Sequence, residues 1–243
     1  MIVKPYKKEF DYSYTLGVFP TIELLQNQPG IVKKVILHSS GSQNQGIDRI
    51  IELCNQHGIS VESNDKLVNR LSKKENCYAV GIFSKLPGFL SGESNHILLV
   101  NPSDMGNLGT IIRTAVGFGC TDIGIISPAV DAYNPKVIRG SMGSFFKVNL
   151  QYFDSFEEYK GSYHNQIFTF RLNGETTLNE IRKYPDKPYA LVFGNESSGL
   201  GSEFDNIGIG VRIPHSQEID SLNLAVAVGI ALNHFANLSD TQH

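Results

Sequence analysis

The alternation of apolar and polar residues is most informative near the middle of the chain. Residues 97–100 form an apolar run that is short enough for a buried strand. A polar turn containing glycine follows, and apolar residues then recur at helical spacing over residues 108–116. Gly117 and Gly119 predict the end of that helix, and residues 122–127 predict the next buried strand. This β-α-β pattern indicates a parallel sheet, because parallel neighbours need a crossover connection.

The first ninety residues also contain patterns that predict helices and strands. Their patterns predict helices at 20–28, 47–57 and 65–71, and strands at 32–38, 59–62 and 78–83. Pro29-Gly30 and Gly58 are strong signals for the ends of the first two helices. This part of the chain is therefore expected to be a small α/β domain in its own right.

A change in composition separates this part from the rest. Residues 85–95, KLPGFLSGESN, are rich in Pro, Gly and Ser and have no apolar periodicity. We place a domain boundary there, near residue 90, which gives an amino-terminal domain at 1–90 and a carboxy-terminal domain at 91–243.

The carboxy-terminal part continues the α/β pattern. Further strands are predicted at 145–150, 166–170, 189–193 and 207–213. Residues 222–235, LNLAVAVGIALNHF, are apolar on nearly every helical face, which predicts a fully buried helix. The predicted fold class is α/β with a parallel sheet.

Polar turns follow three of the predicted buried strands, at residues 101–107, 194–199 and 214–223. A parallel sheet brings the loops at the carboxyl ends of its strands to one rim, where ligands bind. Glycines at both ends of the second turn permit a close approach of the backbone to a ligand. The candidate functional residues in or beside these turns are Asn107, Arg113, Glu196, Ser221 and Asn223.

Each candidate also has a simpler structural interpretation. Asn107 could cap the helix predicted over residues 108–116, and Arg113 could lie on the solvent-facing side of that helix. Glu196 could cap a following helix, and Ser221 could be the N-cap of the last helix. Asn223 is expected inside that helix, where capping explains it less easily.

Charge and the remaining motifs narrow the possible functions. The net charge is −3, but residues 1–90 carry 11 Lys/Arg and 8 Asp/Glu, whereas residues 91–243 carry 10 and 16. The basic first domain could face a polyanion, with Lys33, Lys34, Lys73 and Lys74 as candidate phosphate contacts, although +3 is also within ordinary variation. Residues 140–143 (GSMG) with Lys147 could hold a phosphate or form a plain turn.

Several standard sites are absent from the sequence. It contains no P-loop, no nucleophile-elbow motif and no zinc-binding H-E-x-x-H, and the glycines at 117 and 119 follow a helix, unlike a dinucleotide fingerprint. Three cysteines and seven histidines show no metal-ligand spacing, so no metal site is predicted. Unpaired cysteines favour a reducing compartment. Because no signal peptide or membrane-length apolar run is present, we expect a cytoplasmic protein without a membrane partner.

Three motifs together resemble one enzyme family. Residues 107–115, NLGTIIRTA, resemble the first motif of the SpoU (TrmH-type) RNA ribose methyltransferases of the SPOUT superfamily. Residues 191–200, LVFGNESSGL, resemble the second, and Ile-Pro at 213–214 with Ser-Leu-Asn at 221–223 before an apolar helix resembles the third. The match covers residues 97–235. Residues 12–84 more weakly resemble a substrate-binding domain similar to the ribosomal L30e protein.

Some positions depart from the family pattern. His215-Ser216-Gln217 stands where a methionine-and-glycine turn is common, and Leu224-Ala225 replaces a frequent Val-Ser. Residues 139–144 fit another family segment only loosely. These departures bear on substrate and cofactor-loop contacts rather than on the class of enzyme.

The resemblance has specific implications for fold and chemistry. It implies a SPOUT parallel-sheet domain with a deep trefoil knot, preceded by the small L30e-like domain, and a homodimer with active sites near its interface. Backbone around Gly194, Ile213 and Leu222 would bind S-adenosyl-L-methionine. The reaction would be methyl transfer to a ribose 2′-OH of rRNA or tRNA, with no metal required. Arg113 would act on the hydroxyl and the adjacent phosphate, and Asn107, Glu196, Ser221 and Asn223 would complete the catalytic site.

Two other classes of protein remain as alternatives. One is a non-catalytic RNA- or ribosome-binding protein with a decayed SpoU site, which the joint presence of all five polar candidates disfavours. The other is a nucleotide-dependent enzyme of the Rossmann type, which the missing fingerprint disfavours. The choice of RNA and of nucleotide is left open by the sequence.

Overall fold

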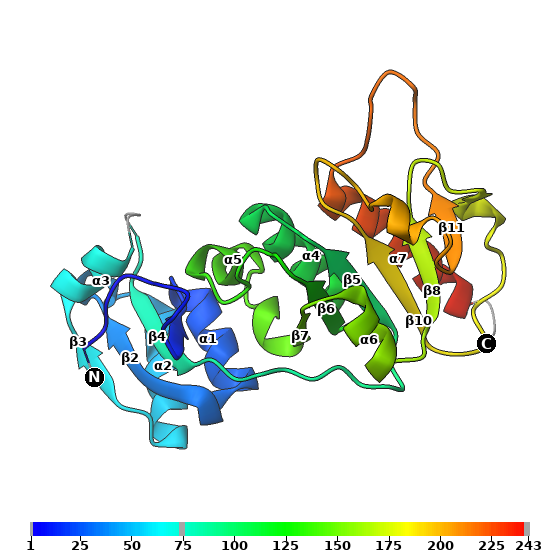
Figure 1. Cartoon of the computed structure of the whole chain (residues 1–243). Helices are drawn as coiled ribbons and strands as arrows, with labels where there is room; N and C mark the ends of the chain where they lie inside the picture. Colours follow the sequence, from blue (N-terminus) through cyan, green and yellow to red (C-terminus); the bar gives the residue numbers. More distant parts are fainter. Residues whose placement is uncertain (1, 73–75, 241–243) are drawn as a thin grey trace. The chain divides into compact units, whose positions relative to one another are not determined.

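A computed structural model describes residues 2–72 and 76–240 of the chain (Figure 1). Two of the predicted phosphate contacts, Lys73 and Lys74, lie outside the described residues. Within the part that the structure describes, no helix is both long and apolar enough to cross a membrane.

The chain divides into two compact units, each with its own sheet. Unit 1 consists of Met1–Leu86 and Asp131–Lys147, and unit 2 consists of Pro87–Val130 and Val148–His243. The first division, after Leu86, falls in the predicted linker. Residues 131–147 were expected in the second domain, whereas the structure groups them with unit 1.

Unit 1 is built on a mixed four-stranded sheet of order β1-β4-β2-β3, in which only the β2–β3 pair is parallel. The strands are β1 (Tyr12–Tyr14), β2 (Val32–Leu37), β3 (Val61–Ser63) and β4 (Ala79–Ser84). The helices are α1 (Val18–Asn27), α2 (Gln45–His57) and α3 (Asp65–Leu71). Helix α2 is capped at its start by Asn44, whose side chain accepts a hydrogen bond from Gly46 N, and at its end by Gly58, which has a left-handed φ of 66°.

Aromatic packing explains why residues 131–147 belong to unit 1. This segment contains α5 (Pro135–Gly140) and a 3₁₀ turn, η3 (Ser144–Lys147). The rings of Phe145 and Phe146 lie 6.4 and 5.2 Å from the ring of Phe83 on β4, measured between centroids. The three rings are buried. Burial of aromatic area on the sheet of unit 1 outweighs the sequence continuity with the second domain.

Unit 2 is built on a seven-stranded parallel sheet of order β7-β6-β5-β10-β8-β11-β9. The strands are β5 (His96–Val100), β6 (Asp122–Ile126), β7 (Asn149–Phe153), β8 (Gln166–Phe170), β9 (Thr176–Thr177), β10 (Tyr189–Phe193) and β11 (Ile209–Arg212). The predicted β-α-β unit is confirmed, because β5 and β6 are parallel neighbours joined by α4 (Met105–Gly117). All five residues of β5, β6 and β10 are buried, as expected for a parallel sheet covered on both faces.

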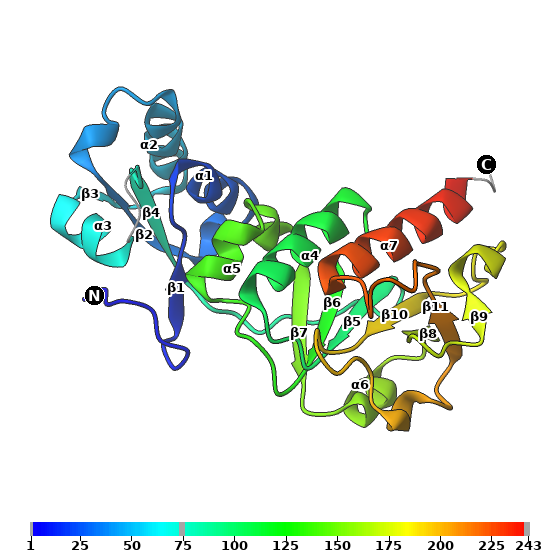
Figure 2. The same ribbon diagram turned by 90° about the horizontal axis from the view of Figure 1, so that it is seen from above.

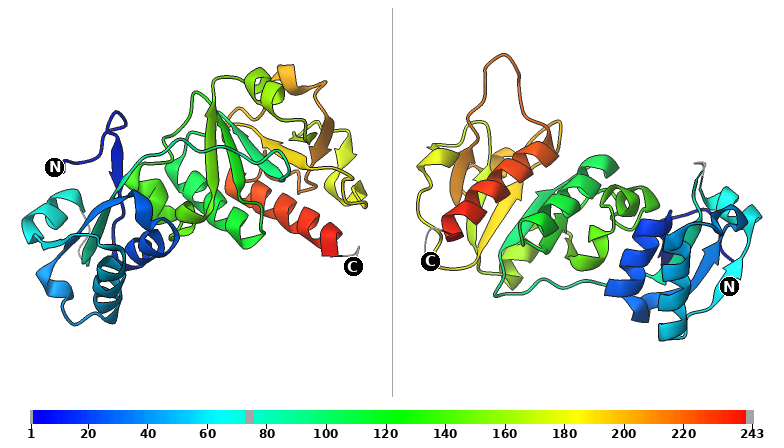
Figure 3. Two further views of the ribbon diagram at one scale, coloured as in Figure 1. Left: turned by 90° about the horizontal axis from the view of Figure 1, so that it is seen from below. Right: turned by 180° about the vertical axis from the view of Figure 1, so that it is seen from behind.

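Helices cover both faces of this sheet. Helices α4 and α7 (Leu224–Asp240) lie on one face, and α6 (Phe156–Ser162) lies on the other (Figure 2). Two views from other directions show α4 and α7 side by side (Figure 3). Under α6, the aromatic side chains of α6 and of η5 (Ser202–Phe204) pack on Leu98, Val100 and Val192 of the sheet.

The prediction of a fully buried last helix is wrong for the single chain. Val228, Leu232 and Phe235 of α7 are buried, but Val226 and Ile230 are 51% and 38% exposed. The two exposed residues are four positions apart and therefore share one helical face. The sequence could not reveal this face, because its side chains are as apolar as those that pack on the sheet.

Candidate functional site

The first polar turn connects β5 to α4, and its own residues set the turn and the start of the helix. Asn101, directly after β5, has a left-handed φ of 53°, which Asn tolerates better than most residues. Asp104 is the N-cap of α4, because its carboxylate accepts a hydrogen bond from Asn107 N at 2.7 Å. The expectation that Asn107 caps this helix is therefore wrong. Its amide is left available for other partners.

The second polar turn follows β10 and is unusually tight. Asn195 and Gly199 exchange backbone hydrogen bonds at 3.1 and 2.9 Å, and the Asn195 side chain accepts a bond from Ser197 N at 2.9 Å. A Cβ on Gly194 would lie 2.0 Å from the carbonyl carbon of Gly199, so only glycine fits there. Asn195 Nδ2 donates to Asn101 O at 2.8 Å, which ties this turn to the first one.

Glu196 projects from the second turn onto the first. Its Oε2 accepts hydrogen bonds from Ser103 N and Ser103 Oγ at 3.0 and 2.8 Å. Its Oε1 accepts from Asp104 N at 3.0 Å and from Asn107 Nδ2 at 3.2 Å. Partial burial acts to raise the pKa of Glu196, but the hydrogen bonds from Ser103 and Asp104 outweigh it and lower the pKa below the ordinary 4.5. The carboxylate is thus held in its charged form.

The third polar turn joins the same network through Asn223. Its Nδ2 donates to Asn107 Oδ1 at 3.0 Å, and its Oδ1 accepts from Ala225 N at 2.9 Å and Val226 N at 3.3 Å. Because α7 begins at Leu224, Asn223 is its N-cap, and the expectations that Ser221 caps the helix and that Asn223 lies inside it are wrong. One chain of hydrogen bonds therefore connects all three turns.

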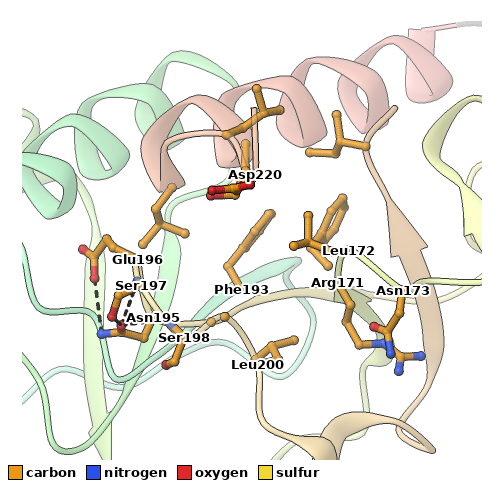
Figure 4. A pocket seen from close by; sticks show the side chains of 18 of the residues that line it. Arg171, Leu172, Asn173, Phe193, Asn195, Glu196, Ser197, Ser198, Leu200 and Asp220 are labelled. Atoms are coloured by element: carbon orange, nitrogen blue, oxygen red, sulfur yellow. Dashed lines mark hydrogen bonds between the residues drawn. The ribbon is translucent and has the colours of Figure 1, made fainter. Parts of the chain in front are cut away.

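A cavity of about 350 Å³ opens beside this network (Figure 4). Its apolar walls come from β8, β10, β11 and α7, and its polar rim comes from the second and third turns. The lining includes Phe170, Phe193, Ile213, Leu222 and Leu224 among apolar residues, and Arg171, Asn195, Glu196, His215, Asp220 and Ser221 among polar ones. A volume of this order and a mixed lining are typical of a site for a small molecule.

The predicted site residues fall into three groups. Gly194, Ile213 and Leu222, the predicted cofactor contacts, all line the cavity, together with Glu196 and Ser221. Asn107 and Asn223 do not line it but are joined to Glu196 by the hydrogen bonds described above.

Arg113 stands apart from both groups. It lies two turns into α4 and is exposed, and its side chain makes neither a hydrogen bond nor an ion pair with any residue that the structure describes. Within one chain its guanidinium is therefore open to an external partner.

Sequence reasoning missed several residues of this site. Ser103 and Asp104 hold the Glu196 carboxylate, and Arg171 and Asp220 line the cavity. The Ser-Asp pair before α4 could have been recognised from the sequence, since such residues are preferred at helix starts. Arg171 follows β8 with no motif around it, and only the sheet order brings it to the cavity.

The comparison with protein families decides the relationship. The model of the SpoU rRNA Methylase family matches residues 94–233, which is more than half of the chain. The chain belongs to the SpoU rRNA methylase family. All three motifs that we identified, and the whole of the hydrogen-bonded network, fall within the matched residues.

Individual relatives of this SpoU family member agree. It is 34% identical over 140 residues to an uncharacterized tRNA/rRNA methyltransferase of Synechocystis, which covers 56% of this chain and 50% of that one. The chain thus spans about half the length of that relative. It is 23% identical over 217 residues to the 23S rRNA (guanosine(2553)-2′-O)-methyltransferase RlmP of Bacillus subtilis, covering 88% of this chain and 84% of that one.

A solved structure also matches over nearly the whole chain. The AdoMet-bound rRNA methyltransferase from Sinorhizobium meliloti superimposes with a TM-score of 0.77 at 26% identity, covering 93% of this chain and 87% of that one. The parallel-sheet α/β architecture of unit 2 is therefore that of a SpoU methyltransferase. Among the described residues, no group of three or more His, Cys, Asp or Glu side chains is arranged to hold a metal ion.

Proposed function

We propose that this chain transfers a methyl group from S-adenosylmethionine to a ribose 2′-OH of rRNA or tRNA. The observation that carries the proposal is the chain of hydrogen bonds from Asn223 through Asn107 to Glu196, which joins the three motif turns beside one cavity. A decayed site would have no reason to keep this carboxylate charged and fully hydrogen-bonded. The 2′-O-methyltransferase name of the Bacillus relative supports the choice of hydroxyl.

The cavity fits S-adenosylmethionine in size and chemistry. Phe170, Phe193 and Leu222 offer apolar surfaces for a flat base. The carboxylates of Glu196 and Asp220 lie on the rim, where they favour a positively charged group. Gly194 allows the backbone of the second turn to fold tightly, and Ile213 and Leu222 bring the third turn to the same cavity.

In the proposed reaction the protein orients groups rather than bonding to them. When bound, S-adenosylmethionine supplies an electrophilic methyl group on a sulfonium sulfur, and the sulfide is a good leaving group. Asn107 and Glu196 fix the start of α4, and with it the base of the helix that carries Arg113. Ser221 presents a hydroxyl to the cavity. Holding the reactants in alignment in this way is worth several orders of magnitude in rate.

Arg113 is proposed to bind the RNA. A guanidinium keeps its proton in proteins, so we assign it the phosphate next to the target ribose and the negative charge that develops on the 2′-oxygen, not the role of a base. Its exposure and its lack of a partner among the described residues suit this role. The 2′-OH is the group that distinguishes RNA from DNA, so a reaction at that oxygen is selective for RNA.

The proposal extends to assembly and topology. The exposed apolar residues Val226 and Ile230 of α7 and Phe118 at the end of α4 are proposed to pack in a homodimer. A trefoil knot formed by residues 213–223 and α7 is proposed on the family resemblance of the three motifs.

Unit 1 is proposed to be an L30e-like RNA-binding domain, which its mixed sheet and flanking helices support. Residues 91–243 without the 131–147 segment then carry the catalysis. Three free cysteines and an RNA substrate support a cytoplasmic location.

The decisive experiment incubates the full chain with methyl-labelled S-adenosylmethionine and rRNA or tRNA, and then maps the labelled nucleotide. We expect label on a ribose. Replacing that nucleotide by its 2′-deoxy analogue is the matched control and should abolish incorporation. Label on a base, or incorporation that survives the deoxy substitution, would contradict the assignment to the 2′-oxygen.

A further inference from the structure

Two segments that are far apart in sequence form one surface of unit 1. Gly143, in the turn between α5 and η3, has a left-handed φ of 84°, and a Cβ there would lie 2.4 Å from Glu23 Cγ on α1. Lys147 Nζ lies 2.6 Å from the same Glu23 carboxylate. The turn at residues 140–147 is therefore seated on α1. The sequence left open whether this turn is plain or holds a phosphate.

Two apolar side chains are exposed on the segments that make this contact. Phe19 lies one helical turn before Glu23, on the same face of α1, and is 49% exposed. Met142, next to Gly143, is 46% exposed and has a φ of 50°, a conformation that is rare for a residue with a long side chain. A strained residue that presents its side chain to solvent is a common feature of binding sites. Neither side chain gains the burial that would explain its position.

The net charge of unit 1, to which this surface belongs, favours a polyanion. Unit 1 carries 14 Lys/Arg and 9 Asp/Glu, a net charge of +5, whereas unit 2 carries 7 and 15, a net charge of −8. Assigning residues 131–147 to unit 1 thus strengthens the contrast that the sequence showed. Lys147 keeps 40% of its side chain exposed despite the ion pair with Glu23. Its remaining ammonium protons are open to a second acceptor.

We propose that Phe19, Met142 and Lys147 bind an unpaired nucleotide of the RNA substrate. The base lies against the phenyl ring and the thioether, and its phosphate contacts the Lys147 ammonium. Single-stranded RNA is recognised in this way, by stacking on exposed aromatic rings beside a positive charge. This inference rests on the proposed function, since it assigns a second contact for the same RNA.

The test measures binding of the full chain to a fluorescein-labelled single-stranded RNA oligonucleotide of mixed sequence, and to the same RNA annealed to its complement. Phe19→Ala and Met142→Ala should each weaken single-strand binding, by on the order of tenfold for the ring. Phe19→Tyr should restore it. Lys147→Gln should lower the salt dependence of log Kd by about 0.7. Phe89→Ala is the matched control, because Phe89 is 72% exposed but belongs to unit 2.

The outcomes separate this proposal from the assigned reaction. If the wild type methylates RNA but Phe19→Ala and Met142→Ala bind the oligonucleotide normally, the proposed nucleotide contact is overturned. The proposed reaction is then unaffected. If the variants no longer sediment as a dimer but keep their RNA affinity, the surface binds a second copy of the chain. That result would also overturn the proposal. Unchanged thermal unfolding and unchanged calorimetric binding of S-adenosylhomocysteine are expected for every variant, so a loss of RNA affinity reports the surface.

Discussion

Glu196→Gln is the sharpest test of how the three turns are held together. The substitution keeps the shape of the side chain but replaces one carboxylate oxygen with an NH₂ group. Glu196 Oε2 accepts from Ser103 N, Ser103 Oγ and Asn195 Nδ2, and Oε1 accepts from Asp104 N and Asn107 Nδ2. Whichever way the new amide turns, at least one backbone N–H meets a donor instead of an acceptor.

The size of the effect follows from these contacts. A hydrogen bond to a charged group is worth about 1.5–3 kcal/mol, and the amide forfeits at least two of them. Glu196 is only partly buried, so solvent screens part of that loss, and we expect a cost of about 2 kcal/mol in the free energy of unfolding. For a unit of this size, such a cost lowers Tm by roughly 4–8 °C.

The same residue predicts a pH dependence with a definite sign. The pKa of Glu196 is lowered in the folded state, so the carboxylate binds fewer protons there than in the unfolded chain. Its stabilisation is fully present above the ordinary value of 4.5 and is lost as the pH falls through the lowered folded pKa. The glutamine of Glu196→Gln cannot titrate. As the pH falls below 4.5, the free energy of unfolding of this variant should therefore decrease less steeply than that of the wild type.

Thermal and urea unfolding between acid and neutral pH would measure both effects. Glu93→Gln is the matched control, because Glu93 is exposed and its carboxylate makes neither a hydrogen bond nor an ion pair with any residue that the structure describes. It should leave Tm and the acid dependence unchanged. If Glu196→Gln has the Tm of the wild type and loses stability at acid pH as steeply as the wild type, this carboxylate does not join the turns.

Substitutions at three further positions test the other parts of the site and the proposed dimer. Arg113→Ala should lower single-turnover methyl transfer by on the order of a hundredfold while calorimetric binding of S-adenosylhomocysteine is retained; loss of both would make Arg113 structural. Asn223→Ala should cost about 1 kcal/mol of stability in urea unfolding, and Asn223→Asp should recover part of it, since Asp is also a good N-cap but cannot donate to Asn107 Oδ1; equal losses would argue against capping. Val226→Lys should convert a sedimenting dimer to a monomer, and an unaffected dimer would place the interface elsewhere.

Much of unit 2 was predictable because its signals are local. The β-α-β pattern at residues 97–127 fixed two parallel strands, and polar turns after apolar runs indicated the rim. Gly194 could be recognised from the glycine-bracketed turn. These features depend on periodicity and on backbone freedom, both of which act over a few residues.

The rest depended on contacts between distant segments. Residues 131–147 pack on unit 1 because Phe145 and Phe146 find Phe83, more than sixty residues earlier, and no local pattern records that partner. The exposed face of α7 likewise depends on which side meets the sheet. Asn223 could have been recognised as the N-cap only if the start of α7 had been placed one residue beyond it.

The choice of amides in the network follows from hydrogen bonding around a single carboxylate. Asn107 must donate to Glu196 Oε1 and accept from Asn223 Nδ2 at the same time, and an amide has both a donor and an acceptor to do so. An aspartate there would set a second negative charge against Glu196, and a leucine would leave both partners unsatisfied. Asn107, Glu196 and Asn223 are thus committed to one another, whereas the guanidinium of Arg113 has no partner among the residues that the structure describes.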